Sequence, residues 1–219
     1  MKKLVSSIFI TTLFTISLPA QAVLVSMADT FFGADSITLD TDTGLEWLDV
    51  TLSTNRSYVD VSGEFGAGGD FEGFRYASAD ELLTLFSNAN IPNVNNYSAA
   101  NVVPALALVD LVGATGFQDT FPETVGITGT SNNPGTRVLG LIDYVVSISG
   151  AMVTDIYGAT AFADWDESMA LSVDEGGSWL LREATNPAYV PLPGAIWLFC
   201  SGMLAVFAWR RETAKATRA

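Results

Sequence analysis

The chain of 219 residues contains no histidine. Histidine is the base of Ser-His-Asp triads and Cys-His pairs and a frequent zinc ligand, so these kinds of site are excluded. A phosphate-binding loop is not expected either, because Gly66-Ala67-Gly68-Gly69 lacks a following lysine. A glycosidase needs only two carboxylates, but the 24 acidic residues single out no pair. We therefore predict that the protein is not an enzyme; a carboxylate-dependent, glycan-acting enzyme remains the catalytic alternative.

Cysteine is almost absent as well. The one cysteine, Cys200, lies in an apolar run near the C-terminus, so no disulfide can join parts of the chain before that run. That preceding part, about 165 residues long once an N-terminal leader is set aside, is sufficient for one domain with a real core. Its stability must then come from packing, with bound cations as a further contribution.

Positive charge is scarce between residues 23 and 189. This span holds four arginines against 23 carboxylates, because Glu212 is the only acidic residue outside it, and its formal charge is −19. The four basic residues are Arg56, Arg75, Arg137 and Arg182. The electrostatic field of this negative charge repels nucleic acid and attracts divalent cations or cationic polymers. The simpler interpretation is solubility of a secreted domain. In either case no nucleic-acid partner is expected.

The N-terminus has the pattern of a secretory signal peptide. Met1-Lys2-Lys3 is a basic start, the stretch from Leu4 to Leu18 is apolar, and Ala20-Gln21-Ala22 is a small-x-small cleavage site. This predicts a signal peptide over residues 1–22, with the Sec translocon and signal peptidase as partners and cleavage after Ala22. A retained N-terminal anchor is the alternative.

The C-terminus carries a second apolar run, which spans residues 194–209 without a charge and ends at Arg210 and Arg211. Sixteen residues of helix measure about 24 Å, slightly less than the roughly 30 Å hydrocarbon core of a bilayer. The basic residues flank both apolar runs on the sides that would stay in the cytoplasm, so the positive-inside rule predicts that residues 23–189 are translocated. A buried C-terminal core helix is the alternative to this short membrane span.

The same tail resembles a known sorting signal. Val190-Pro191-Leu192-Pro193, an apolar helix and then Arg210-Arg211 are similar to the PEP-CTERM tail of Gram-negative bacteria, with Leu192 where glutamate is usual. The resemblance implies a tail over residues 190–213 and processing by an exosortase. It also implies an inner-membrane stage, a later location in the cell envelope or outside the cell, and a role in biofilm or exopolysaccharide matrix. A permanently membrane-anchored ectodomain is the alternative.

The exported part, residues 23–189, has mixed helix and strand patterns. Ser36–Leu39 and Leu45–Val50 read as strands, and Ser78 with Glu81 forms a capping box that predicts a helix. A second helix is expected from Pro104 through Val112. Strands are expected later, at residues 126–130, 138–149, 151–157, 168–173 and 178–182. The expected fold is therefore α+β, a single domain with early helices and a late antiparallel sheet.

Two acidic clusters are candidate calcium ligands. Asp40-x-Asp42-x-Gly44 places two carboxylates on a tight turn, and Asp164-x-Asp166 offers a second pair. Oxygen ligands of this kind suit Ca²⁺, although neither cluster has the remote glutamate of a full calcium-binding loop. An Asx turn and a solvated acidic edge are the simpler interpretation.

Two tryptophans are candidate glycan-stacking residues. The segments at 43–49, 73–77 and 177–182, which include Trp47 and Trp179, resemble landmarks of uncharacterised PEP-CTERM proteins. They are more distantly similar to DUF1566 or Lcl-type extracellular domains, from which no activity carries over. Trp47 and Trp179 are most simply core aromatics; a sugar-binding face in a lectin-like protein is the alternative.

Overall fold

The computed structural model describes residues 23–118, 120–149, 152–171 and 176–184. The predicted signal peptide, with Ala20 and Ala22, and the predicted tail over residues 190–213 lie outside this part of the chain. None of the helices in the described ranges is long and apolar enough to cross a membrane. The span expected at residues 194–209 is not among them.

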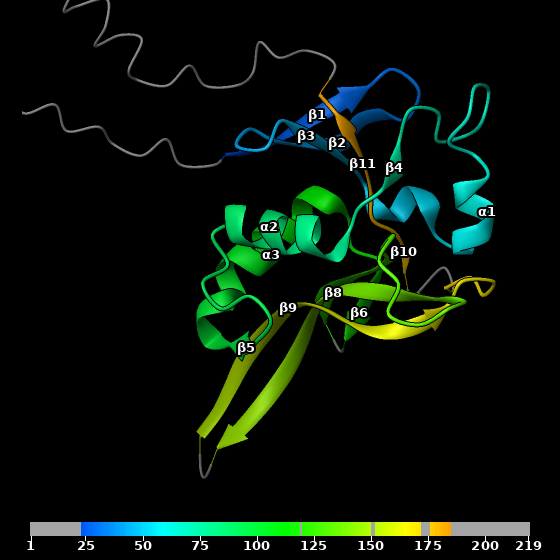
Figure 1. Cartoon of the computed structure of the whole chain (residues 1–219). Helices are drawn as coiled ribbons and strands as arrows, with labels where there is room; N and C mark the ends of the chain where they lie inside the picture. The colour runs from blue at the N-terminus through cyan, green and yellow to red at the C-terminus, as the bar shows by residue number, and fades with distance from the viewer. Residues whose placement is uncertain (1–22, 119, 150–151, 172–175, 185–219) are drawn as a thin grey trace, which may run out of the picture. The chain divides into compact units, whose positions relative to one another are not determined.

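The described residues form a mixture of strands and helices (Figure 1). The strands are β1 Leu24–Asp29, β2 Gly33–Asp40, β3 Leu45–Leu48, β4 Arg75–Tyr76, β5 Tyr97–Ser98, β6 Gly116–Gln118, β7 Phe121–Ile127, β8 Thr136–Ser149, β9 Met152–Asp166, β10 Gly177–Ser178 and β11 Leu180–Glu183. The helices are η1 Val50–Ser53, α1 Tyr58–Ser62, α2 Ala79–Asn88, η2 Ala99–Asn101 and α3 Val102–Val112.

The strands pair into two sheets. The first has the order β1-β2-β3-β11-β4, and all its neighbours run antiparallel. The second has the order β10-β7-β8-β9-β5, with β6 also paired to β7, and only the β10–β7 pair is parallel. Strands β8 and β9 form one long hairpin, paired from Thr136 opposite Asp166 to Ser149 opposite Met152 (Figure 1).

The α+β class expected from the sequence is confirmed, but the order of its parts is only partly right. The late antiparallel sheet exists as the β7–β9 sheet, whereas the first sheet combines the two ends of the described chain. Strand β11 inserts beside β3, with Leu181 opposite Trp47. Residues 168–170, expected to start a strand, instead form a turn after β9, in which the Asp166 side chain accepts from Ser168 N–H.

Both expected helices are present. The N-terminus of α2 has the predicted capping box, in which the Ser78 hydroxyl accepts from Glu81 N–H and the Glu81 carboxylate accepts from Ser78 N–H. Strong caps of this kind fix where a helix begins. Helix α3 begins two residues before Pro104 and is terminated by Gly113, whose φ of 86° is unfavourable for other residues.

The core lies between the helices and the two sheets. Trp47 and Trp179 are 1% and 0% exposed and pack edge to face, with ring centroids 6.3 Å apart. Phe86 of α2 packs edge to face on Trp179 from the helix side. A second group of buried side chains, including Ile37 and Phe71, lies beyond this one under the α1 region.

Candidate functional site

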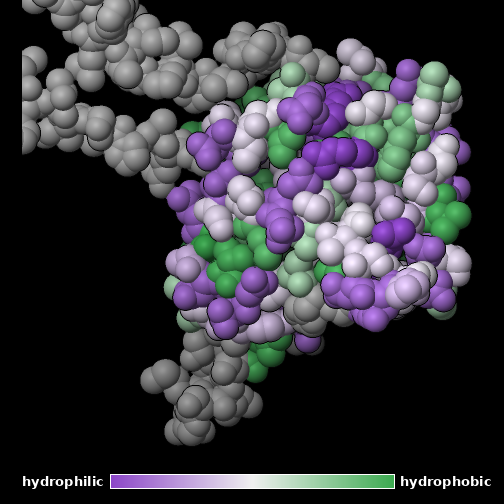
Figure 2. All heavy atoms as spheres, viewed as in Figure 1, coloured by the Kyte–Doolittle hydropathy of each residue, from purple (hydrophilic) through white to green (hydrophobic). Residues whose placement is uncertain are grey.

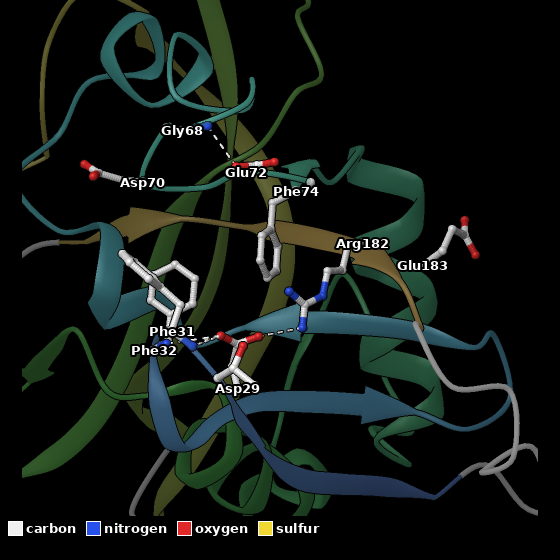
Figure 3. Close-up of a pocket in the computed structure, with 12 residues that line it drawn as sticks. Asp29, Phe31, Phe32, Gly68, Asp70, Glu72, Phe74, Arg182 and Glu183 are labelled. Atoms are coloured by element: carbon white, nitrogen blue, oxygen red, sulfur yellow. Dashed lines mark hydrogen bonds and ion pairs between the residues drawn. The ribbon is translucent and has the colours of Figure 1, made fainter.

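A cleft of about 840 Å³ opens between three segments: the β1–β2 turn, the glycine-rich loop before β4 and the end of β11. We call it the acidic-aromatic cleft, because its lining includes three phenylalanines and four acidic residues around Arg182 (Phe31, Phe32, Phe74, Asp29, Asp70, Glu72 and Glu183). Glu46 does not line the cleft and contacts Arg182 from behind. Figure 3 shows the Phe74 ring between the Phe31–Phe32 pair and Arg182, with Asp70 and Glu183 toward opposite outer sides.

The β1–β2 turn presents an exposed aromatic ring. Asp29 ends β1, and its Oδ1 accepts from the N–H groups of Phe31 at 2.7 Å and Phe32 at 3.1 Å. This Asx-type turn fixes the backbone so that the two rings diverge. Phe32 stacks on the buried Phe71, whereas Phe31 meets Phe32 edge to face and is 75% exposed. The turn therefore holds an aromatic side chain in solvent at the rim of the cleft.

The glycine-rich loop is held by buried aromatics and by backbone contacts. Phe71 and Phe74 are 1% and 4% exposed and anchor it to the core. A Cβ on Gly69 would lie 2.3 Å from the carbonyl oxygen of Glu64, so a side chain at this position would displace the loop. Gly68 N–H donates to the Glu72 carboxylate at 2.8 Å. The loop thus presents backbone and carboxylate groups to the cleft with few side chains in the way.

Arg182 forms the inner wall and is already neutralised. Its Nε donates to Glu46 and its Nη2 to Asp29, both at 2.7 Å, and its guanidinium lies 4.5 Å from the Phe74 ring centroid. Burial opposes the charged form of Arg182, but these hydrogen bonds raise its pKa overall. Burial likewise opposes ionisation of Asp29, yet hydrogen bonds from Phe31 and Arg182 leave its pKa below the ordinary value. Arg182 and Asp29 are therefore both held in their charged forms.

The outer rim adds further negative charge. Asp70 is 62% exposed and pairs with Arg56 at 2.8 Å. Glu72 and Glu183 are exposed, and neither forms an ion pair within the described part of the chain. The cleft therefore combines a flat apolar face with exposed carboxylates, of which Glu72 accepts one hydrogen bond from Gly68 and has no ion pair in the described part of the chain. This combination suits a polyhydroxylated or cationic ligand.

The two tryptophans that the sequence suggested for glycan stacking lie elsewhere. Trp47 and Trp179 are fully enclosed, and the Trp179 Nε1 donates to the carbonyl of Gly140. A ring without solvent access offers no face to a sugar, so the structure favours the core interpretation of both residues.

The suggested calcium ligands are separated into two unrelated places. Asp40 is 0% exposed, and its carboxylate accepts from Asp42 N–H and Asn88 Nδ2, as in an Asx turn. Asp164 accepts from Asn132 and Asn133, while Asp166 accepts from Ser168. Within the described ranges no three acidic, histidine or cysteine side chains gather closely enough to hold a metal ion. Calcium binding at Asp40, Asp42, Asp164 or Asp166 stays a prediction.

A second titratable cluster lies on the β7–β8–β9–β5 sheet, away from the cleft. Tyr97 donates to Asp143 Oδ2 at 2.5 Å across Gly158, which has no side chain to separate them. Burial raises the pKa of Asp143, and burial together with the charge of Asp143 raises that of Glu123. Burial raises the pKa of Tyr157 to about 12, with the charge of Glu123 as a further cause. None of these residues lines the acidic-aromatic cleft.

The residues of the cleft were not singled out from the sequence, although one signal was present. Two adjacent phenylalanines, Phe31 and Phe32, stand between Asp29 and Gly33. Asp and Gly at these positions indicate a turn, and a turn is where an apolar ring is most readily exposed. The sorting motif Val190, Pro191, Leu192 and Pro193, with Arg210 and Arg211, lies outside the described residues.

No protein-family model matches this chain, and neither a curated protein nor a solved structure was found to match it.

Proposed function

We propose that this protein is exported across the inner membrane of a Gram-negative bacterium and sorted by an exosortase to the cell envelope or the exterior. There it has a non-catalytic role in an extracellular matrix that contains exopolysaccharide. The observation that carries the proposal is the order of three signals at the C-terminus. Val190-Pro191-Leu192-Pro193 comes first, the uncharged run at residues 194–209 follows, and Arg210-Arg211 closes the tail.

The fold is compatible with removal of that tail. Every described strand and helix ends by Glu183, and Ala184 N–H donates to the carbonyl of Gly44 at 2.9 Å. Cleavage near Pro191 or Pro193 would therefore remove no described element of either sheet. Proline also restricts the backbone around it to extended conformations, which are those that proteases bind. These features support release of residues 23–189 as a folded unit.

Charge supports a location outside the cytoplasm. The span of residues 23–189 carries four arginines and 23 carboxylates, whereas the lysines and remaining arginines lie in the two terminal segments. Under the positive-inside rule this distribution favours translocation of the acidic part. Hydrophilic residues cover most of the face drawn in Figure 2, with hydrophobic ones in separate patches, which is compatible with a solvated surface.

Sorting is tested by the chemical ends of the mature chain. The full gene is expressed in a Gram-negative host with its exosortase and in the same host with the exosortase deleted, and the protein is recovered from each cell fraction for mass spectrometry. We expect the mature chain to begin at Val23 in both hosts. With exosortase it should end near residues 190–193 in the envelope or medium; without it, the chain should end at Ala219 in the inner membrane.

A matched pair of variants separates motif recognition from general damage. Replacing Pro191 and Pro193 by alanine should block processing, whereas Pro134→Ala, in an exposed turn of the domain, should leave it intact. A chain that ends at Ala219 in the membrane of the exosortase-positive host would establish the permanently anchored alternative. Cytosolic protein that retains Met1 would refute export altogether.

A lectin-like function is the second candidate, and the acidic-aromatic cleft favours it. Phe31 is exposed at the rim of a cleft whose volume lies in the range of ligand sites, about 300–1,000 Å³. The exposure of Phe31 supports a glycan contact there, rather than at the enclosed Trp47 and Trp179. A carboxylate-dependent enzyme remains the catalytic alternative, and turnover of the host's own exopolysaccharide by the purified protein would establish it.

A further inference from the structure

We propose that the acidic-aromatic cleft binds a glycan that carries protonated amino groups. The Phe31 ring and the carboxylate of Glu72 would make the principal contacts. This proposal names a ligand class for the matrix role proposed above. It depends on that role only because the protein would encounter such a polymer outside the cell. The binding itself follows from the cleft.

The aromatic part of the cleft is suited to a flat, rigid ligand. The Phe31 ring is held by the Asx-type turn at Asp29 and backed edge to face by Phe32, so little conformational freedom is lost when a ligand stacks on it. The exposed face of a phenyl ring matches the C–H face of a pyranose. Gly68, Gly69 and Gly73 leave the opposite side of the cleft open, because they add no side chains to it.

The charged part of the cleft selects for positive charge. Arg182 is the only basic residue in the lining, and its charge is neutralised by ion pairs with two carboxylates, Asp29 and Glu46. Arg56 compensates the exposed Asp70 from outside the lining. Glu72 forms no ion pair in the described part of the chain, whereas Glu183, on the other face of β11 from Arg182, interacts electrostatically with Arg75. An acidic glycan would be repelled in the cleft, a neutral one would leave the charge of Glu72 unpaired, and an amine-bearing one would pair with it.

The combination favours an amino sugar over a basic peptide. A lysine side chain would satisfy the carboxylates but gain little from a rigid exposed phenyl ring. An amino sugar uses both, because its apolar face and its ammonium group belong to one rigid ring. Its hydroxyl groups can also donate to the carboxylate of Glu72.

The test is calorimetric titration of the purified full chain in a polyoxyethylene detergent, which avoids sugar-based detergents. The probes are a β-1,4-linked glucosamine hexamer, the same hexamer fully N-acetylated, and hexalysine, at a mildly acidic pH at which the amines are protonated. We expect the glucosamine hexamer to bind, the N-acetylated hexamer to bind at least about tenfold more weakly, and added salt to weaken binding. Hexalysine should also bind at least about tenfold more weakly than the glucosamine hexamer.

Matched variants localise the site. Phe31→Ser should weaken binding of the glucosamine hexamer about tenfold, and Glu72→Gln about threefold or more. The controls are Phe117→Ser, which removes another exposed ring at 68% exposure, and Asp110→Asn, which removes an exposed carboxylate of α3. Both controls should bind as the unchanged protein does.

Three results would overturn the proposal: equal binding of the two hexamers, hexalysine binding as tight as that of the glucosamine hexamer, or equal losses in the Phe31→Ser and Phe117→Ser proteins. The second result would identify a basic peptide as the better ligand class. Because purified protein is used, failure of exosortase sorting would leave these measurements unchanged, and failure to bind would leave the sorting experiment unchanged.

Discussion

The indole Nε1 of Trp179 donates to the carbonyl oxygen of Gly140 at 3.0 Å, and the indole fills the space where a side chain at residue 140 would lie. A Cβ on Gly140 would come within 2.8 Å of that nitrogen and 2.0 Å of Leu82 Cδ2. Gly126, the partner of Gly140 on β7, is equally close to the ring, at 2.8 Å from Trp179 Cδ1. Two paired glycines therefore make the recess into which Trp179 packs.

Gly140→Ala is expected to destabilise the fold by about 1–3 kcal/mol, because the added methyl group overpacks a core that has no room for it. The measurement is urea unfolding followed by circular dichroism. Gly66→Ala is the matched control, since a Cβ there has no atom within 4 Å and the backbone is not left-handed. That variant should stay within about 0.5 kcal/mol of the parent. Equal losses of stability in the Gly140→Ala and Gly66→Ala proteins would contradict the close packing of Trp179 against Gly140.

Local features of the fold were accessible from the sequence, and pairings were not. The Ser78–Glu81 box located α2 because a cap depends on residues three positions apart. Alternation indicated a strand near Trp47 but carried no information about its neighbour, which is β11 at the other end of the described chain. From the sequence alone, Gly126 and Gly140 look unfavourable for a strand, because a glycine weakens a strand interior. The Trp179 ring, which leaves no room for a side chain at either position, lies far away in sequence.

Glu81→Gln is expected to destabilise the protein by about 1 kcal/mol near neutral pH, the scale of a helix cap. The hydrogen bond from Arg75, followed by those from Ser78, lowers the pKa of Glu81 to about 2. A carboxyl group whose pKa is lowered on folding contributes stability above its unfolded value of 4.5 and loses it as pH falls toward 2. The loss caused by Glu81→Gln should therefore shrink steadily in unfolding experiments from pH 5 to about pH 2.

The control for this prediction is Asp80→Asn, in the same first turn of α2. Asp80 shares the favourable position near the helix N-terminus, but its side chain has neither the Arg75 ion pair nor the cap. Its effect should be smaller than that of Glu81→Gln. An equal effect would show that the helix dipole, and not the capping box, accounts for the stabilisation.

Solvent exposure is the property that sequence alone could not supply for the aromatic residues. Trp47 and Phe31 are both large aromatics beside acidic residues, and residue type alone does not say which one reaches solvent. Trp47 faces inward on an inner strand, while Phe31 is turned outward by hydrogen bonds of Asp29 to the backbone. The Asp29–Arg182 contact, which joins the turn to β11, spans 153 positions of sequence.

Arg182→Leu is expected to destabilise the protein by about 3–5 kcal/mol, because Asp29 and Glu46 would be left as buried carboxylates without a cation. Their side chains are only 7% and 5% exposed. Urea unfolding at neutral pH gives the magnitude. Arg75→Leu serves as the comparison: its ion pair is 49% exposed on the arginine side, so its loss should cost less than about 1 kcal/mol. A loss of stability below about 1 kcal/mol for Arg182→Leu would contradict a buried ion-pair cluster of Arg182, Asp29 and Glu46.

Asp143→Asn tests the cluster on the second sheet, where Tyr97 from β5 donates to the carboxylate and Glu123 from β7 interacts with it electrostatically. Burial raises the pKa of Asp143, and its Oδ1 has no hydrogen-bond partner among the described residues. A carboxyl group whose pKa is raised on folding stabilises the protein below its unfolded value of 3.8 and loses this effect as pH rises through the folded pKa.

The Asp143→Asn protein should consequently be more stable than the parent at pH 7, by about 1 kcal/mol, because the variant removes a buried, incompletely paired charge. As pH falls to the unfolded value of 3.8 and below, the two proteins should approach each other, since the parent carboxyl group then becomes protonated. Tyr97→Phe removes the donor to Asp143 and should act in the opposite direction, with a loss that is larger at pH 7 than at pH 4. Thermal unfolding of the three proteins across this range measures both effects. If the Asp143→Asn protein is less stable than the parent at pH 7, the charge of Asp143 stabilises the folded state, and the burial assigned to it is wrong.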